Sequence, residues 1–172
     1  MITTRLYKPK DRKKVLKFMK SVDKDFKPPI EEREGGIEAY LDDVLKRKYR
    51  IYILEDHKFF LFFPKIVGIV MTYKKGENRV IKYLAIAEEY RGKGHGRDMI
   101  ETALLDIRKS KKVLLRTWST NFGAISLYTK LGFKFHKIVR DRDRKGEDKS
   151  IYLKMEQEDI ENLKEEASKV IK

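Results

Sequence analysis

The chain has 172 residues, a formal charge of +14 and no cysteine. A chain of this length can bury a single core and still form a cleft. The absence of cysteine excludes disulfides, thiolate metal sites and a cysteine nucleophile. A hydrophobic content of 41%, with nine Phe and nine Tyr, excludes a disordered tail. The positive charge favours anionic partners, which include a phosphorylated cofactor, nucleic acid and an anionic surface.

The composition also bears on the source and the location of the protein. Lys and Glu are abundant while only one Gln and three Asn occur, which is a thermophile-like bias. The most apolar stretch, residues 59–71, is interrupted by Pro64 and Lys65 and is too short to cross a bilayer. The sequence therefore predicts a cytoplasmic protein without membrane contact.

The first third of the chain predicts one strand and two helices. Residues 2–9 have the pattern of a strand, and residues 11–24 that of an amphipathic helix. The apolar face of this helix repeats at helical spacing, and its opposite face carries a basic stripe made of Lys13, Lys17, Lys20 and Lys24. A second helix follows the Lys-Pro-Pro sequence at 27–29, with one apolar face formed by Ile37, Tyr40, Leu41, Val44 and Leu45.

The remainder of the chain alternates strands with helices. Extended segments are predicted at 50–56, 65–73, 79–87 and 112–118, with a helix from about residue 96, a short helix at 121–132 and a hairpin at 133–155. Helices between the later strands imply some parallel pairing, because such a crossover needs a dozen or more residues. We therefore predict an α/β fold with a mixed sheet over residues 1–155, followed by a C-terminal helix over residues 156–172.

A dense aromatic run has three interpretations. Phe59, Phe60, Phe62 and Phe63 are too close together for strict alternation between two faces of a strand. The run is compatible with a homodimer contact, with a surface covered by the C-terminal helix, and with a strand buried on both faces.

The sequence Arg-Gly-Lys-Gly-His-Gly at residues 91–96 lies between a predicted strand and a predicted helix. It fits neither GxxxxGK followed by Ser or Thr nor GxGxxG, because position 97 is Arg. Glycines nevertheless allow an anion to approach backbone N–H groups, and a helix N-terminus adds partial positive charge. One glycine would be enough for a turn. Three glycines among basic residues predict a diphosphate site.

Two motifs together resemble a known family. Residues 91–96 match the signature Gln/Arg-x-x-Gly-x-Gly/Ala of the GNAT superfamily of acyl-CoA-dependent N-acetyltransferases. Residues 121–133 resemble the second motif of that family, N-x-x-A-x-x-L-Y-x-K-x-G-F. The clear resemblance covers residues 79–135. It implies a six- to seven-stranded mixed sheet that splays open between its central parallel strands.

The resemblance implies that acetyl-CoA is the acyl donor. Backbone groups at the end of the strand 79–87 would pair with the pantetheine arm, and N–H groups of residues 91–96 would hold the diphosphate. Asn121 would contact the arm, and it is also a candidate helix cap. The implied cofactor-binding residues are Leu84, Ala85, Ile86, Arg91, Gly92, Lys93, Gly94, His95, Gly96, Asn121 and Tyr128.

Tyr128 resembles the family residue that protonates the departing thiolate, and it is therefore the predicted catalytic residue. A neutral amine attacks the thioester carbonyl, and a phenol within hydrogen-bond reach can donate to the leaving sulfur. The spacing alone favours a core tyrosine, and the resemblance to the motif reverses that preference. Because the chain has no cysteine, the resemblance implies direct acetyl transfer to a primary amine in a ternary complex.

The sequence departs from the family pattern at the general base. Two strand positions often hold a Glu, and here they are Val80 and Arg116. Ribosomal-protein N-terminal acetyltransferases use the second position, so Arg116 argues against assigning that activity directly. Candidate substitutes are Glu77, Glu88 and Tyr83. His57 and His136 have no partners at metal spacing, so no metal is predicted.

The acceptor amine is not identified by the sequence. In the family, the acceptor site forms from the first two helices, their connection and the last strand pair, which here include residues 27–36 and 140–149. The acceptor could be a small molecule, a peptide or a protein. An alternative function is a basic module that retains a CoA-binding pocket and docks on RNA or a ribonucleoprotein through the basic stripe, although no nucleic-acid motif is present.

Overall fold

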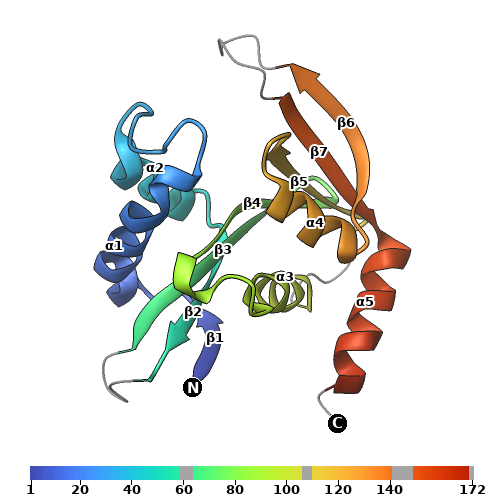
Figure 1. The fold of residues 1–172 in the computed structure, drawn as a ribbon, viewed down its shortest axis with the longest axis horizontal. Helices are drawn as coiled ribbons and strands as arrows, with labels where there is room; N and C mark the ends of the chain where they lie inside the picture. The colour runs from blue at the N-terminus through green and yellow to red at the C-terminus, as the bar shows by residue number, and fades with distance from the viewer. Residues whose placement is uncertain (59–63, 106–109, 141–148, 171–172) are drawn as a thin grey trace.

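The protein is built on one seven-stranded sheet (Figure 1). The computed structural model describes residues 1–58, 64–105, 110–140 and 149–170. The order across the sheet is β1-β2-β3-β4-β5-β7-β6, and only β4 and β5 pair in parallel. The strands are β1 (Ile2–Leu6), β2 (Arg50–Asp56), β3 (Lys65–Lys75), β4 (Asn78–Ile86), β5 (Lys112–Trp118), β6 (Lys134–Arg140) and β7 (Lys149–Glu156). The predicted mixed sheet is confirmed.

Five α-helices flank this sheet. In Figure 1, α1 and α2 lie to the left of β3 and β4, whereas α3 and α4 lie to the right. The C-terminal α5 packs against α3, β5 and β7, with Ile160 and Leu163 buried. The helices are α1 (Arg12–Val22), α2 (Gly36–Lys46), α3 (His95–Leu105), α4 (Phe122–Lys130) and α5 (Gln157–Val170).

The helices bury the faces that their periodicity predicted. In α1 the apolar stripe is buried while its lysines are exposed, and Ile37, Leu41 and Val44 of α2 are buried as well. In α3, Met99, Ile100, Ala103 and Leu104 are buried, and residues 106–109 after it lie outside the described residues. The aromatic run at residues 59–63 also lies outside them, so its three interpretations stay open. No helix in the described part of the chain combines the length and the apolar character needed to cross a bilayer.

The central strands separate soon after they begin to pair. The parallel ladder of β4 and β5 is limited to Arg79–Ile81 opposite Val113–Leu115, although β4 continues to Ile86 and β5 to Trp118. A β-bulge lies at the same level, because Thr72 of β3 is opposite Ile81 and Met71 is opposite Tyr83, which leaves Lys82 as the extra residue. The sheet therefore opens into a gap between β4 and β5.

The connection between α1 and α2 crosses this gap. Its buried carboxylate, Asp23, accepts hydrogen bonds from the backbone N–H groups of Ile30 (2.7 Å) and Glu31 (3.1 Å). Phe26 stacks on Tyr83 of β4 with ring centroids 4.7 Å apart. Lys27 donates to the hydroxyl of Thr120, after β5, at 3.4 Å. These contacts hold the connection over both edges of the gap.

Candidate functional site

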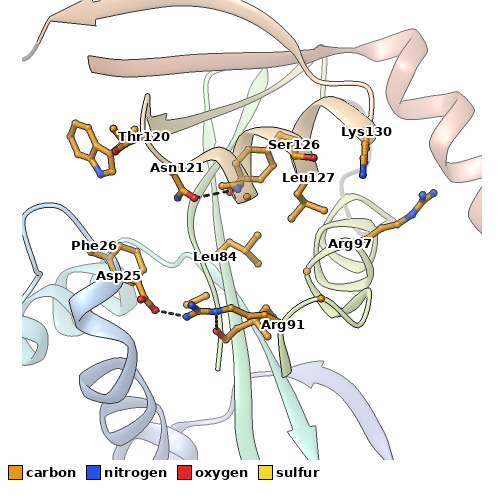
Figure 2. Close-up of a pocket in the computed structure, with 18 of the residues that line it drawn as sticks. Asp25, Phe26, Leu84, Arg91, Arg97, Thr120, Asn121, Ser126, Leu127 and Lys130 are labelled. Carbon is orange, nitrogen blue, oxygen red and sulfur yellow. Dashed lines mark hydrogen bonds and ion pairs between the residues drawn. The ribbon is translucent and has the colours of Figure 1, made fainter. Parts of the chain in front are cut away.

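A cleft of about 890 Å³ occupies the gap between β4 and β5 (Figure 2). Four segments line it: the α1–α2 connection, the end of β4, the β4–α3 turn with the start of α3, and the β5–α4 turn with α4. Its charged lining residues are one acid, Asp25, and five bases, namely Lys24, Lys27, Arg91, Arg97 and Lys130. The cleft is therefore suited to an anionic ligand.

The glycine-rich turn presents free backbone N–H groups to the cleft. Gly92 has φ +72° and Gly94 has φ +88°, a conformation that L side chains rarely adopt, and a Cβ at either position would project into open space. Within the described residues, no acceptor takes a hydrogen bond from the amides of residues 92–96. Because α3 begins at His95, its dipole adds partial positive charge at the same place. The turn thus has the features of an anion cradle.

Arg91 links the turn to two other segments. Its Nε donates a hydrogen bond to the carbonyl oxygen of Ile86 at 2.8 Å, and its guanidinium forms an ion pair with Asp25 of the α1–α2 connection. Figure 2 shows both interactions at the lower edge of the cleft. One lone pair of the Ile86 carbonyl is therefore already used, and the second is available to a ligand.

The walls of the cleft are formed by β4 and α4. Leu84 of β4 and Leu127 of α4 point toward one another across the cleft in Figure 2. The side-chain oxygen of Asn121 accepts a hydrogen bond from the backbone N–H of Ala124 at 3.2 Å, so Asn121 caps α4. Its amide nitrogen is left to donate to a ligand. The helix-cap role and the ligand-contact role are thus compatible.

Tyr128 combines burial with access to the cleft. Its side chain is 7% exposed and lines the cleft, and its ring packs edge-on against Phe133 with centroids 5.9 Å apart. No described residue hydrogen-bonds its hydroxyl. Burial raises the pKa of Tyr128 to about 12, because the neutral phenol is favoured where water is excluded. The residue therefore remains a hydrogen-bond donor at neutral pH.

The cleft brings together most, but not all, of the cofactor-binding residues predicted from sequence. The lining includes Leu84, Ala85, Ile86, Arg91, Gly92, Gly94, Gly96, Asn121 and Tyr128. Lys93 and His95 do not line it. The ammonium of Lys93 donates to the carbonyl oxygen of Glu89 at 2.7 Å, and the Nδ1 of His95 lies 3.7 Å from the carboxylate of Asp98. Any role of these two residues is limited to their backbone N–H groups.

None of the predicted substitutes for the general base fits that role. Glu77 forms an ion pair with Lys111 at 2.6 Å, Glu88 forms one with Lys24 at 3.4 Å, and neither carboxylate lines the cleft. Tyr83 is 2% exposed, and burial raises its pKa well above the ordinary value. The one lining carboxylate, Asp25, is paired with Arg91. Among the described residues, the cleft therefore holds no unpaired acid.

Sequence reasoning missed several lining residues. On α4 the residues Gly123, Ser126, Leu127 and Lys130 are at positions i, i+3, i+4 and i+7 relative to one another, so helical periodicity would have identified them. Residues 24–27 reach the cleft only through tertiary contacts, which no local pattern encodes. A metal site has no support in the described ranges, where no three His, Asp or Glu side chains are grouped to hold an ion.

Comparison with known proteins agrees with this architecture. The family model described as "Acetyltransferase (GNAT) domain" matches residues 47–135. The chain belongs to the GNAT acetyltransferase family. An N-alpha-acetyltransferase of Sulfurisphaera tokodaii is 35% identical over 89 residues, which are 50% of this chain and 52% of that protein. The chain thus matches about half the length of this curated relative.

Solved GNAT structures share the fold. The ribosomal-protein-S18-alanine N-acetyltransferase from Escherichia coli superposes with a TM-score of 0.73 at 19% identity, covering 91% of this chain and 94% of that one. A chain of the NatC complex bound to Gag peptide and CoA gives a TM-score of 0.70 at 20% identity, covering 90% and 98%. At these identities the likeness concerns the fold alone.

The burial of Tyr128 predicts an unusual titration. Because the folded-state pKa is raised to about 12, the phenol stabilises the fold below its ordinary pKa of about 10, and this contribution is lost as the pH rises from about 10 toward 12. An ultraviolet difference titration of the wild type against Tyr128→Phe isolates the tyrosinate absorbance. We expect a midpoint near pH 12. A midpoint at or below pH 10 would contradict the burial of this phenol.

Proposed function

We propose that this protein transfers the acetyl group of acetyl-CoA directly to the α-amino group of a polypeptide, with both substrates bound at once. The observation that carries the proposal is the gap between β4 and β5. Free N–H groups at residues 92–96, the unpaired edge of β4 and the hydroxyl of Tyr128 all meet in one cleft there. An acyl donor with a diphosphate and an extended amide-containing arm matches these three features.

The donor is proposed to lie along the cleft with its anionic end at the glycine-rich turn. The diphosphate would accept hydrogen bonds from the amides of residues 92–96, and each such charge-assisted bond contributes about 1.5–3 kcal/mol. Arg97 and Lys130 extend the positive charge beyond the turn. The backbone of Leu84–Ile86 and the amide of Asn121 would bind the arm, since the gap leaves this edge of β4 without a strand partner.

Tyr128 is proposed to stabilise the leaving sulfur. The amine nitrogen forms a C–N bond with the thioester carbonyl carbon, the C–S bond breaks, and one proton in net moves from nitrogen to sulfur. A thiol has a pKa near ~8.5, about 3.5 units below that of Tyr128, so the phenol shares its proton with the thiolate and does not lose it. The proton that ends on sulfur therefore comes from the amine, directly or through solvent.

The absence of an unpaired carboxylate in the described lining favours acceptors that arrive neutral. An α-amine with a pKa near ~7.8 is about one-third neutral at pH 7.5, whereas a lysine side chain with a pKa near ~10.4 is about one-thousandth neutral. The relative from Sulfurisphaera tokodaii is named an N-alpha-acetyltransferase, which agrees with this choice. We therefore propose a polypeptide N-terminus as the acceptor.

The RNA-docking alternative gains no support from the described residues. In the basic stripe of α1, Lys20 lies 3.7 Å from the carboxylate of Glu38, and Lys24 lies 3.4 Å from that of Glu88. The stripe is thus partly neutralised by the protein itself. Exposed lysines of this kind are ordinary on a solvated helix face.

Free-thiol release from acetyl-CoA tests the function and the role of Tyr128 together. The acceptor is a lysine-free peptide, and its control is the same peptide with a blocked N-terminus. We expect release only with the free N-terminus. Tyr128→Phe should lower kcat about a hundredfold with little change in the KM for acetyl-CoA, because the donor to sulfur is lost.

Tyr73→Phe is the matched control for Tyr128→Phe. Tyr73 stacks on Tyr49 with ring centroids 4.6 Å apart and does not line the cleft, so kcat should be unchanged. Equal turnover by Tyr128→Phe and the wild type would remove Tyr128 from the reaction. Equal release from the blocked peptide would contradict the choice of an α-amine.

The cradle is tested by a pair of glycine variants. Gly94→Ala should weaken acetyl-CoA binding about tenfold, or ~1.4 kcal/mol, because its φ of +88° is strained for alanine and the turn must shift. Gly76→Ala is the control, since Gly76 also has a positive φ (+59°) with open space around it but lies in the β3–β4 turn. Calorimetry that shows the same affinity for both variants would contradict the cradle.

A further inference from the structure

Two cationic residues flank the point where β4 and β5 separate. The last pair of the parallel ladder is Ile81 opposite Leu115. The next residues on the two strands are Lys82 and Arg116. The first residue on each side of the gap is therefore cationic. Lys82 is also the extra residue of the β-bulge in β4. Bulges re-aim a side chain, and this one coincides with the opening of the sheet.

Lys82 lies directly after the parallel ladder, near other positive charges. Lys82 is exposed, yet its pKa is lowered by partial desolvation and then by the positive charges of Arg116, Arg33 and Arg47. Arg47 follows α2, and Arg33 lies in the α1–α2 connection. The guanidinium of Arg116 lies 5.1 Å from the ring centroid of Trp118, which lines the cleft. The pair therefore borders the cleft at the point where β4 and β5 separate.

The protein supplies little negative charge to this pair. Among the described residues, neither Lys82 nor Arg116 makes an ion pair with a carboxylate. Asp43, whose negative charge acts on Lys82, is held by Arg47 at 2.8 Å. By contrast Lys112, four residues before Arg116 on the same strand, is paired with Glu156 at 3.4 Å. Like charges placed together repel, and a bound carboxylate would relieve that repulsion.

We propose that Lys82 and Arg116 select polypeptide N-termini that carry Asp or Glu in the residues directly after the first. This inference rests on the proposed function, because it concerns the acceptor of that same site. The donor occupies the side of α3 and α4, so the acceptor must approach from the side of α2, past the two cations. A carboxylate one or two residues from the amine then meets Lys82 and Arg116. Charge complementarity of this kind contributes more to specificity for one partner than to the affinity of the complex.

The positive charges also act on the amine itself. A cationic group nearby lowers the pKa of an ammonium, so it increases the fraction of acceptor that is neutral and reactive. A basic residue after the first would instead be repelled by the pair. The two positions thus favour acidic N-termini and disfavour basic ones.

The test uses three peptides that share an N-terminal alanine and differ only in the next two residues, which are Glu-Glu, Gln-Gln or Lys-Lys. Free-thiol release at saturating acetyl-CoA gives kcat/KM for each peptide. At low salt we expect kcat/KM to be about tenfold higher for the Glu-Glu peptide than for the Gln-Gln peptide, and lowest for the Lys-Lys peptide. The preference should shrink as ionic strength rises, since the contacts are near the surface.

Variants assign the preference to the two residues. Arg116→Gln and Lys82→Gln should each reduce the ratio of kcat/KM for the Glu-Glu peptide to kcat/KM for the Gln-Gln peptide. Arg116→Glu should make kcat/KM higher for the Lys-Lys peptide than for the Glu-Glu peptide. Lys112→Gln is the control, because it removes a positive charge from the same strand before the gap, and it should keep the wild-type ratio. Thermal unfolding and acetyl-CoA binding verify that each variant is folded.

Two outcomes of the thiol-release assay would overturn the inference. In the first, wild-type kcat/KM for the Glu-Glu peptide differs from that for the Gln-Gln peptide by less than twofold. In the second, Arg116→Glu leaves the ratio of these two kcat/KM values unchanged. Either outcome leaves the proposed function intact if the peptides are acetylated. If no peptide releases thiol, the proposed function fails, and calorimetry of the three peptides against protein saturated with CoA still measures the charge preference. Equal binding of the three peptides would then overturn the inference independently.

Discussion

The separation of β4 from β5 is the constraint on which the other features of the site depend. Two parallel strands that pair for only three residues leave the edge of β4 that faces β5 without a strand partner beyond Ile81, while β3 remains paired with the other edge. Backbone N–H and C=O groups that lack partners are costly unless water or a ligand satisfies them. The gap therefore creates a place where an extended, amide-containing ligand can act as a missing strand. The bulge at Lys82 and the α1–α2 connection both lie at this gap.

The two ends of the gap have different chemistry. At its mouth, the glycine-rich turn and the start of α3 offer free N–H groups and partial positive charge, which suit phosphate. Elsewhere in the cleft, Tyr128 is a neutral phenol in a buried environment, and Lys82 and Arg116 directly follow the last paired residues of β4 and β5. The ion pair between Arg91 and Asp25 connects the glycine-rich turn with the α1–α2 connection. Binding of an anion at the turn would thus act on the α1–α2 connection.

Local patterns predicted much of this structure, and tertiary contacts account for what they missed. Helical periodicity predicted the buried face of α1. The glycine-rich motif at residues 91–96 and the motif that begins at Asn121 indicated residues that line one cleft. The ion pair between Asp25 and Arg91 joins positions 66 residues apart, so no local pattern revealed it. The bulge that makes Lys82 an extra residue depends on strand register, which alternation in a single strand does not encode. Glu77 and Glu88 were candidates by sequence position alone, and in the structure each is paired with a lysine while neither carboxylate lines the cleft.

Amide hydrogen exchange with and without saturating acetyl-CoA tests the central claim most directly, because it reports which backbone groups the donor satisfies. The account predicts slower exchange in two segments, residues 82–86 at the free edge of β4 and residues 91–96 in the glycine-rich turn. Exchange in β1 and β2, which lie on the far side of β3 from the gap, should be unchanged. Protection in β1 or β2 without protection in the two segments, or no protection anywhere, would contradict the claim that the gap between β4 and β5 is the acetyl-CoA site.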